Sequence, residues 1–433
     1  MTNAVIIIVD AISYRHSWLT SKEHFPFLYS QKNKFLNFHK HFAVSNGTRN
    51  NLASILSGLP PSLHKTMNRK HSFRNNKYFN LQSFLKKKNY NTFYYATQPL
   101  FHSEIAGDKL DFTDATYLTP SMADFYIPAL NFNKFIKKKH EKIKNEAHFG
   151  IYHYTDVHAP FEPPKIKFKN TKKIYKFILK NSLKILKRFL WLKFKLPFTK
   201  KIQDIYKEYP SLKGNTDPMG PAISLERHPL NKEFYKKVWE EGSLHSDYMQ
   251  MHCNASKYQD KGLEKIFDYF KKNSNDTIFF MLADHGNTDI VNPKIRKLDG
   301  ILKEDLTHIP LSIFSFDENV TKKYNLVGDV NHLTSQTDIF YTIMELLGDY
   351  KIDKEIDKLN FCRNLLNVKN SERYIFSEFN DERAPYGETR MFNLDEEIYL
   401  RIPATDKIDD IIEYKTLLNS VDFKKYQKYS NYK

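Results

Sequence analysis

The sequence predicts an α/β fold with a mostly parallel central sheet, and two apolar runs with a helical segment between them carry the prediction. Residues 4–9 form a run rich in β-branched side chains that ends at Asp10, and residues 277–283 form a second run that ends at Asp284 and His285. Short continuous apolar runs are typical of strands that are buried on both faces of a parallel sheet. We therefore expect both runs to be central strands.

The segment between the runs predicts a helix that begins close to Thr48. Its apolar residues recur at helical spacing, and Gly58 followed by Pro60 supplies a stop signal. These apolar residues are Leu52, Ile55, Leu56 and Leu59. The free N–H groups and the positive dipole end of a helix N-terminus favour a phosphate, a sulfate or an alkoxide at Thr48. A threonine that merely caps the helix explains the local sequence equally well.

Both acids are expected at the carboxyl ends of their strands, which is the edge where open α/β sheets bind ligands. Taken alone, Asp10 fits a helix cap or a turn about as well as it fits a metal-binding or catalytic role. Asp284-His285 is followed by Gly286, which also suits an ordinary tight turn. Taken together, two carboxylates and an imidazole form a donor set for one divalent ion, Mn²⁺ or Zn²⁺.

The order and spacing of these pieces resemble the alkaline phosphatase superfamily, and within it the sulfatase-like branch. Sulfatases carry Cys-x-Pro-Ser-Arg with a glycine ten residues after the cysteine, and counting back from Gly58 puts Thr48 at the nucleophile position. The match is partial, because Asn50, Asn51 and Leu52 replace the Pro, Ser and Arg. Ala11 stands where many sulfatases have a second Asp. The resemblance implies a three-layer sandwich around the mostly parallel sheet.

The threonine changes the chemistry that the resemblance implies. A sulfatase nucleophile is a formylglycine made from Cys or Ser, and Thr cannot form that aldehyde, so a sulfatase reaction is disfavoured. Lipoteichoic-acid synthases and phosphoethanolamine transferases of the same branch use a Thr nucleophile, and their single-metal set resembles Asp10, Thr48, Asp284 and His285. The resemblance thus implies transfer of a phospho-alcohol group, of the phosphoethanolamine or phosphoglycerol class, to a glycan or lipid-linked acceptor through a phosphothreonine intermediate. The donor is a phospho-alcohol compound such as a phospholipid.

Further residues are substrate-contact candidates by the same resemblance. Residues 154–161 look like the family's Asp-x-His-x-Pro segment, which implies that His158 binds a phosphate oxygen or protonates the leaving alcohol. A surface histidine beside a proline is the plain alternative. His64 and His102 lie in loops that border the site in this family, and Asn51 lies beside the nucleophile.

Two other functions stay open at this stage. A hydrolase of phosphate or sulfate esters would use the same residues, with water resolving the intermediate. A non-catalytic membrane- or glycan-binding protein on a decayed phosphatase fold would explain the missing Arg and second Asp.

The basic charge of the chain is concentrated in one segment. The net charge is +17, and residues 165–201 hold fourteen Lys or Arg and no acid, so the rest of the chain carries only +3. Within the segment, basic residues at steps of three and four predict an amphipathic helix suited to an anionic membrane surface. They are Lys173, Lys176, Lys180, Lys184 and Lys187, and Arg188 and Trp191 near one end are further membrane-surface candidates. Packing of this helix on the protein body is an equal alternative, and its long apolar face makes nucleic acid an unlikely partner.

The chain is expected to form a catalytic domain over residues 1–370, with the basic insertion at about 163–240, and a small C-terminal antiparallel subdomain with a tail over 371–433. Two cysteines give no disulfide framework. Met1 is followed almost at once by the first strand, without a leader pattern, and no stretch is apolar enough to span a bilayer. We therefore expect a cytoplasmic protein that is peripheral at the inner membrane face if the basic helix binds lipid.

Overall fold

A computed structural model describes residues 2–64, 80–97, 111–117, 129–158, 245–287, 304–348, 362–367, 375–380, 386–392 and 397–403. Within these residues, nine strands form one sheet in the order β4-β3-β5-β1-β6-β7-β2-β8, with β9 beside β2. All neighbouring strands are parallel except β7, which runs antiparallel to β6 and β2. The predicted mostly parallel α/β sheet is therefore confirmed. The strands are β1 Asn3–Val9, β2 Leu36–Phe42, β3 Asn91–Ala96, β4 Asp114–Tyr117, β5 His148–Tyr154, β6 Thr277–Leu282, β7 His308–Phe314, β8 Gly328–Val330 and β9 Thr334–Ser335.

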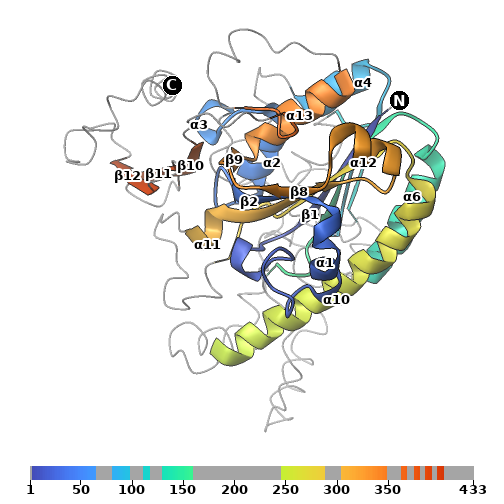
Figure 1. Cartoon of the computed structure of the whole chain (residues 1–433). Helices are drawn as coiled ribbons and strands as arrows, with labels where there is room; N and C mark the ends of the chain where they lie inside the picture. Colours follow the sequence, from blue (N-terminus) through green and yellow to red (C-terminus); the bar gives the residue numbers. More distant parts are fainter. Residues whose placement is uncertain are drawn as a thin grey trace, which may run out of the picture.

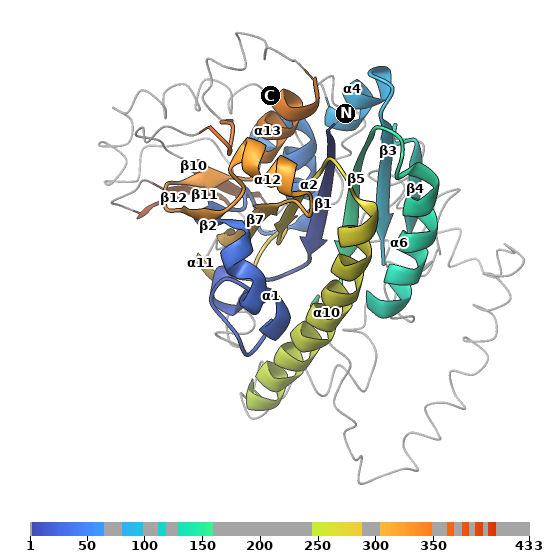
Figure 2. The same ribbon diagram turned by 45° about the vertical axis from the view of Figure 1, so that its right-hand side comes forward.

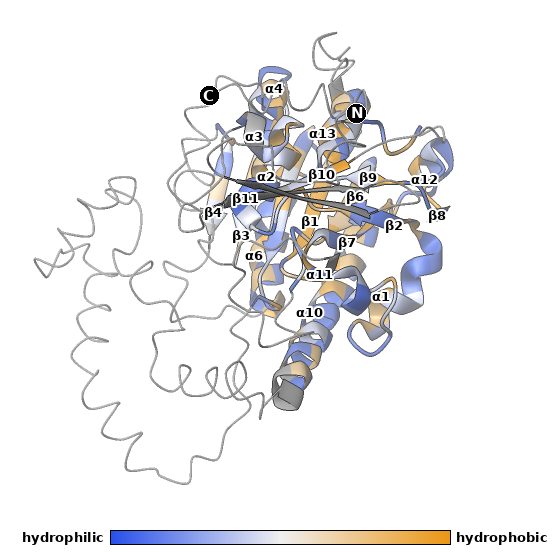
Figure 3. Ribbon diagram, turned by 90° about the vertical axis from the view of Figure 1, so that its left-hand side faces the viewer, coloured by the Kyte–Doolittle hydropathy of each residue, from blue (hydrophilic) through white to orange (hydrophobic). Residues whose placement is uncertain are grey.

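Helices cover both faces of the sheet, so the body has three layers (Figure 1). Alternate residues of β1 enter different cores: Ile6 packs with residues of α2, α4, α12 and α13, and Ile7 packs with residues of α1, α6 and α10. β1 is buried on both faces, in keeping with its apolar sequence from Ala4 to Val9 (Figure 3). The helices are α1 Pro26–Gln31, α2 Thr48–Ser57, α3 Pro61–His64, α4 Leu81–Lys87, α6 Ala129–Ile143, α10 His245–Asn273, α11 Glu304–Thr307, α12 Glu318–Tyr324 and α13 Thr337–Gly348, with short 3-10 turns η1 Tyr14–His16 and η2 Lys32–Lys34.

The predicted helix after the nucleophile position is α2, and Thr48 is its first residue. Gly47 is the N-cap residue, so the reading of Thr48 as the helix cap is wrong. Gly58 ends the helix in the left-handed conformation with φ 70°. A Cβ at Gly58 would lie 2.5 Å from the ring of Phe340 on α13, so both the backbone angle and the close packing require glycine.

The long helix α10 returns the chain to the sheet and lies beside α6 and α1 (Figure 2). The carboxylate of Asp260 on α10 accepts hydrogen bonds from the backbone N–H groups of Phe27 (2.7 Å) and Leu28 (3.0 Å), at the start of α1. These bonds satisfy donors that a helix N-terminus leaves free, and they fix α1 on α10. The basic insertion predicted at 163–240, with all its proposed membrane-surface residues, lies outside the described residues.

A second, smaller sheet follows the large one in the chain. Its strands β10 Ile375–Asn380, β11 Tyr386–Phe392 and β12 Glu397–Pro403 pair antiparallel, as the alternating sequence patterns after residue 370 predicted. Ile375 packs against Phe42 and Leu333, so this sheet contacts the body at the end of β2. The domain boundary near residue 370 stays a prediction. None of the described helices is long and apolar enough to cross a membrane.

Candidate active site

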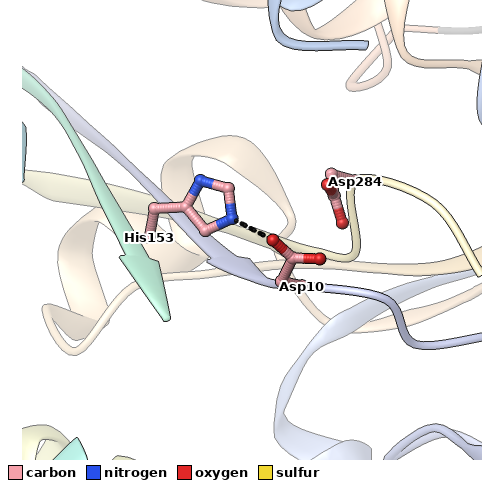
Figure 4. A group of neighbouring side chains, drawn as sticks. All are labelled: Asp10, His153 and Asp284. Atoms are coloured by element: carbon pink, nitrogen blue, oxygen red, sulfur yellow. Dashed lines mark hydrogen bonds and ion pairs between the residues drawn. The ribbon is translucent and has the colours of Figure 1, made fainter. Parts of the chain in front are cut away.

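The pairing of three central strands brings the predicted acids together. β1 and β6 are parallel neighbours, with Ile8 opposite Leu282, so Asp10 and Asp284 each follow two residues later at the same sheet edge. Both carboxylates are fully buried. On the other side of β1, strand β5 places His153 opposite Ile8, and its Nε2 lies 3.0 Å from Asp10 Oδ2 (Figure 4).

One oxygen of each acid is buried without a hydrogen-bond partner. Asp10 Oδ2 contacts His153, and Asp284 Oδ1 accepts a hydrogen bond from Ala11 N (3.0 Å), but Asp10 Oδ1 and Asp284 Oδ2 have no hydrogen-bond partner. Ligand atoms of Asp10, His153 and Asp284 all lie within 4.8 Å of one another. Burying unpaired carboxylate oxygens is costly unless a cation shares their charge. The donor set therefore fits a divalent ion.

Thr48 contacts His285, which in turn lies beside both acids. Thr48 Oγ1 lies 3.1 Å from His285 Nε2, and the same nitrogen lies 3.5 Å from Asp284 Oδ2 and 4.0 Å from Asp10 Oδ1. The other ring nitrogen, Nδ1, lies 2.8 Å from the carbonyl oxygen of Gly286, to which it can donate. In the neutral ring this bond leaves the lone pair on Nε2, facing Thr48 and the acids. The four residues predicted as metal ligands are thus brought together, and their role as ligands stays a prediction.

The electrostatics of the site are dominated by the two acids. Burial raises the pKa of Asp10, but the charges of His158, His153 and His285 outweigh it and lower the pKa overall. Burial lowers the pKa of His285, but the charges of Asp284 and Asp10 outweigh it and raise the pKa overall. The shift of Asp10 favours its anionic form, and the shift of His285 has the negative charge of the two acids as its cause, so a cation is favoured at this position.

Two neighbouring features hold the acid and the nucleophile in place. Gln336, which is fully buried, donates from Nε2 to the carbonyl oxygen of Asp284 (2.6 Å) and accepts at Oε1 from Val44 N (3.1 Å), just ahead of α2. Gly286 passes so close to the segment before β7 that a Cβ there would lie 1.8 Å from the carbonyl oxygen of Asp305. The Asp-His-Gly sequence therefore has a packing reason for its glycine.

The predicted substrate-contact residues divide into three groups. His158 follows β5 at the same sheet edge, near enough for its charge to lower the pKa of Asp10. Asn51 is buried beneath the loop that precedes Thr48, and its side-chain NH₂ donates to the carbonyl oxygen of Ser45 (2.8 Å). His64 is fully buried and its Nε2 shares a hydrogen bond with Ser54 Oγ (2.9 Å) on α2, and its contact with substrate stays a prediction. His102 lies outside the described residues.

His153 is the site residue that the sequence did not reveal. It lies inside the strand sequence 148–154, where a histidine reads as one more buried position. Only the pairing of β5 with β1 shows that its ring reaches Asp10. Its Nδ1 lies 3.2 Å from the hydroxyl of Tyr94 on β3, which fixes the orientation of the ring.

Comparison with protein families gives one match that covers most of the chain. The family model described as Sulfatase matches residues 2–349, which include β1, the Thr48 segment, β5 and β6. No curated protein sequence matches the chain significantly.

Several solved structures share the fold at low sequence identity. Phosphonate monoester hydrolase SpPMH from Silicibacter pomeroyi has a TM-score of 0.60 and 14% identity over 94% of this chain and 90% of that chain. The C-terminal periplasmic domain of EcEptC from Escherichia coli, in complex with Zn, has a TM-score of 0.53 and 15% identity over 91% and 92%. The lipoteichoic acid synthase LtaP from Listeria monocytogenes has a TM-score of 0.53 and 13% identity over 99% and 89%. The architecture is thus common to hydrolases and to a synthase.

Proposed function

The chain belongs to the sulfatase family and is a sulfatase-like enzyme of the alkaline phosphatase superfamily, and on that premise we propose that it is a metal-dependent phosphotransferase. It moves a phospho-alcohol group, of the phosphoethanolamine or phosphoglycerol class, to a glycan or lipid-linked acceptor. The observation that carries the proposal is the position of Thr48. Its hydroxyl begins α2 and lies 3.1 Å from His285 Nε2, beside two buried acids.

The ion would be held by Asp10, Asp284 and His285, with Thr48 as the nucleophile and His153 as a further donor. The two carboxylate oxygens without a hydrogen-bond partner, and the position of His285 Nε2 between Thr48 and both acids, support this assignment. When bound, a divalent ion lowers the pKa of the Thr48 hydroxyl and offsets charge on the phosphoryl oxygens. Imidazole and carboxylate donors suit Zn²⁺ and Mn²⁺, and EcEptC, which shares the fold, was solved with Zn.

Thr48 carries the covalent step. Its Oγ attacks phosphorus in line, so the Oγ–P bond forms, the bond from phosphorus to the donor's alcohol oxygen breaks, and the Thr48 proton passes to solvent water. The N–H groups at the start of α2 and the imidazole of His158 bind the phosphoryl oxygens, and protonated His158 supplies a proton to the leaving alcohol. A hydroxyl of the acceptor then attacks the phosphothreonine and gives its proton to the now neutral imidazole of His158; the acceptor O–P bond forms, the Thr48 Oγ–P bond breaks, and Thr48 Oγ takes a proton from water.

Water in place of the second alcohol would make the same site a hydrolase. The fold is shared with a phosphonate monoester hydrolase, so this reaction is the second candidate. The convergence of Thr48, His285 and both acids gives no support to a decayed, non-catalytic site.

The test is turnover of an aryl phosphodiester by the full chain with Mn²⁺ or Zn²⁺, with and without an added alcohol or glycan acceptor. We expect metal-dependent turnover in the wild type, its loss in Thr48→Ala, and the phosphoryl group joined to the acceptor in the product. Thr97→Val provides a control for loss of a threonine hydroxyl, because Thr97 is buried and its hydroxyl lies 2.6 Å from that of Thr155. Turnover that survives in Thr48→Ala would rule the proposal out, and product that never contains the acceptor would establish the hydrolase.

We also propose that the basic segment 165–201 holds the enzyme against an anionic membrane surface, at the cytoplasmic face, where lipid-linked substrates lie. Its fourteen basic residues without an acid support this placement. Each Lys or Arg near such a surface contributes about 1 kcal/mol. Replacing Lys173, Lys176, Lys180, Lys184 and Lys187 by Gln should abolish sedimentation with phosphatidylserine vesicles and leave turnover of a water-soluble diester intact. Unchanged sedimentation would place the segment on the protein body.

A further inference from the structure

A second cluster of histidines lies away from the sheet edge, between η1, α1 and α10. His16 ends η1, His24 immediately precedes the chain's entry into α1, and His252 lies on α10. Their ring centroids are 4.9 Å apart for His16 and His24, 5.3 Å for His24 and His252, and 5.8 Å for His16 and His252. Each of the three rings therefore contacts the other two.

The cluster is buried, and its orientation is set by serine hydroxyls. The exposed fractions are 9% for His16, 7% for His24 and 0% for His252. Ser13 Oγ lies 3.2 Å from His16 Nδ1, and Ser21 Oγ lies 2.8 Å from His24 Nδ1, so a Ser-x-x-His pattern occurs twice. These contacts engage Nδ1 of both rings and leave Nε2 on the opposite side. His24 Nε2 is buried and has no hydrogen-bond partner.

We propose that His16, His24 and His252 form a second metal site, which binds Zn²⁺ or a similar transition-metal ion through imidazole nitrogens. Three imidazoles on one tetrahedral Zn²⁺, with Zn–N bonds of about 2.0–2.1 Å, have ring centroids about 5 Å apart, and the observed separations match this value. Among the described residues, only Asp10, His153 and Asp284 place ligand atoms within 4.8 Å of one another, so binding here requires the three rings, tilted by 52°, 55° and 72°, to turn until their Nε2 atoms converge. A water molecule would complete the tetrahedron.

The protonation states and the hydrogen bonds of the cluster suit ligands. Metal ions bind neutral imidazole, and burial lowers the pKa of His16 to about 4 and lowers the pKa of both His24 and His252. A hydrogen bond at the nitrogen that does not bind metal is the usual support of a zinc-binding histidine, and the two serines supply it.

The proposed ion would act as a structural clamp. The segment 13–24 continues from β1, whose end carries Asp10, and the ion would attach it to α10 at a point far away in the sequence. An ion that joins these two segments stabilises the folded state by the free energy of metal binding, because the unfolded chain has no preformed site. The site shares no residue with the catalytic group and does not depend on the proposed reaction.

Metal content of the full chain tests the site. The protein is loaded with excess Zn²⁺ and desalted, and the number of zinc ions per chain is measured by elemental mass spectrometry. We expect His24→Gln and His252→Gln each to hold one equivalent less than the wild type. His140→Gln, a change at a buried histidine of another cluster, should hold as much as the wild type. Asp284→Asn should keep the equivalent that His24→Gln loses. Equal metal in His24→Gln and the wild type would overturn the proposal.

Cobalt provides a measurement that needs no change in the cluster. Asp284→Asn protein loaded with Co²⁺ should show the visible absorption of a four-coordinate ion, and X-ray absorption should show scattering from three imidazoles, one more than His153 and His285 of the catalytic group supply. A spectrum with two imidazoles or fewer, or no retained Co²⁺, would mean that the three rings are only packed together. This result decides the question even if His24→Gln fails to fold.

Discussion

Gln336 links the acid to the nucleophile segment, and Gln336→Leu should damage both stability and catalysis. The change removes the hydrogen bonds to Asp284 O (2.6 Å) and Val44 N (3.1 Å) and leaves two buried backbone groups without these partners. Each unsatisfied group costs about 1–3 kcal/mol, so the free energy of unfolding should fall by about 2–6 kcal/mol. Because the bonds set the distance between Asp284 and the segment before Thr48, a shift of about 1 Å should lower kcat by about 100-fold.

Urea unfolding and steady-state turnover of an aryl phosphodiester measure the two effects. Gln82→Leu is the matched control, because Gln82 is equally buried but lies on α4. We expect only Gln336→Leu to lose kcat beyond the loss of folded protein. Gln336→Leu with normal kcat would refute the role of Gln336 in positioning the site.

Four further changes have defined outcomes. Thr48→Ser should keep part of the turnover that Thr48→Ala loses, since it restores the hydroxyl; equal loss in both would contradict a nucleophilic hydroxyl. His153→Asn should weaken Zn²⁺ binding at least about tenfold in a chelator competition, because it removes the ring beside Asp10; unchanged affinity would exclude His153 from the metal site. Gly286→Ala should reduce the yield of folded protein, since its Cβ would lie 1.8 Å from Asp305 O, and normal thermal stability would contradict this packing. Burial lowers the pKa of His140 to about 3, so from about pH 6.5 down to 3 the unfolded chain binds a proton that the folded chain does not. The free energy of unfolding should thus fall by up to about 1.4 kcal/mol per pH unit as pH is lowered. His140→Gln should remove this contribution when the free energy of unfolding is measured by urea titration at several pH values. A pH dependence that is the same in His140→Gln and the wild type would contradict it.

The sequence predicted the parts of the fold that depend on local pattern. The apolar runs at 4–9 and 277–283 are central strands because both faces of the sheet are covered, and the spacing of Leu52, Ile55 and Leu56 predicted α2. Gly58 marked the end of that helix correctly, since its left-handed φ favours glycine. The residues that converge at the sheet edge could be proposed because parallel strands end at the same edge.

The parts that the sequence did not predict depend on contacts between distant segments. His153 joins the site through strand pairing, and Gln336 through hydrogen bonds to two separate loops. His64 lies near Thr48 in the sequence, yet α3 directs its ring toward Ser54 and away from solvent. No local pattern specifies such contacts.

The central claim is that Thr48 forms a covalent bond to the transferred phosphoryl group. Mass spectrometry of the peptides of the digested protein tests it most directly. The full chain with Zn²⁺ or Mn²⁺ is exposed briefly to phosphatidylethanolamine or phosphatidylglycerol, quenched in acid and digested. We predict a mass increase equal to phosphoethanolamine or phosphoglycerol, confined to the peptide that contains Thr48 and absent from Thr48→Ala. Donor turnover with the adduct on another residue, or with no adduct at any time after mixing, would contradict the account.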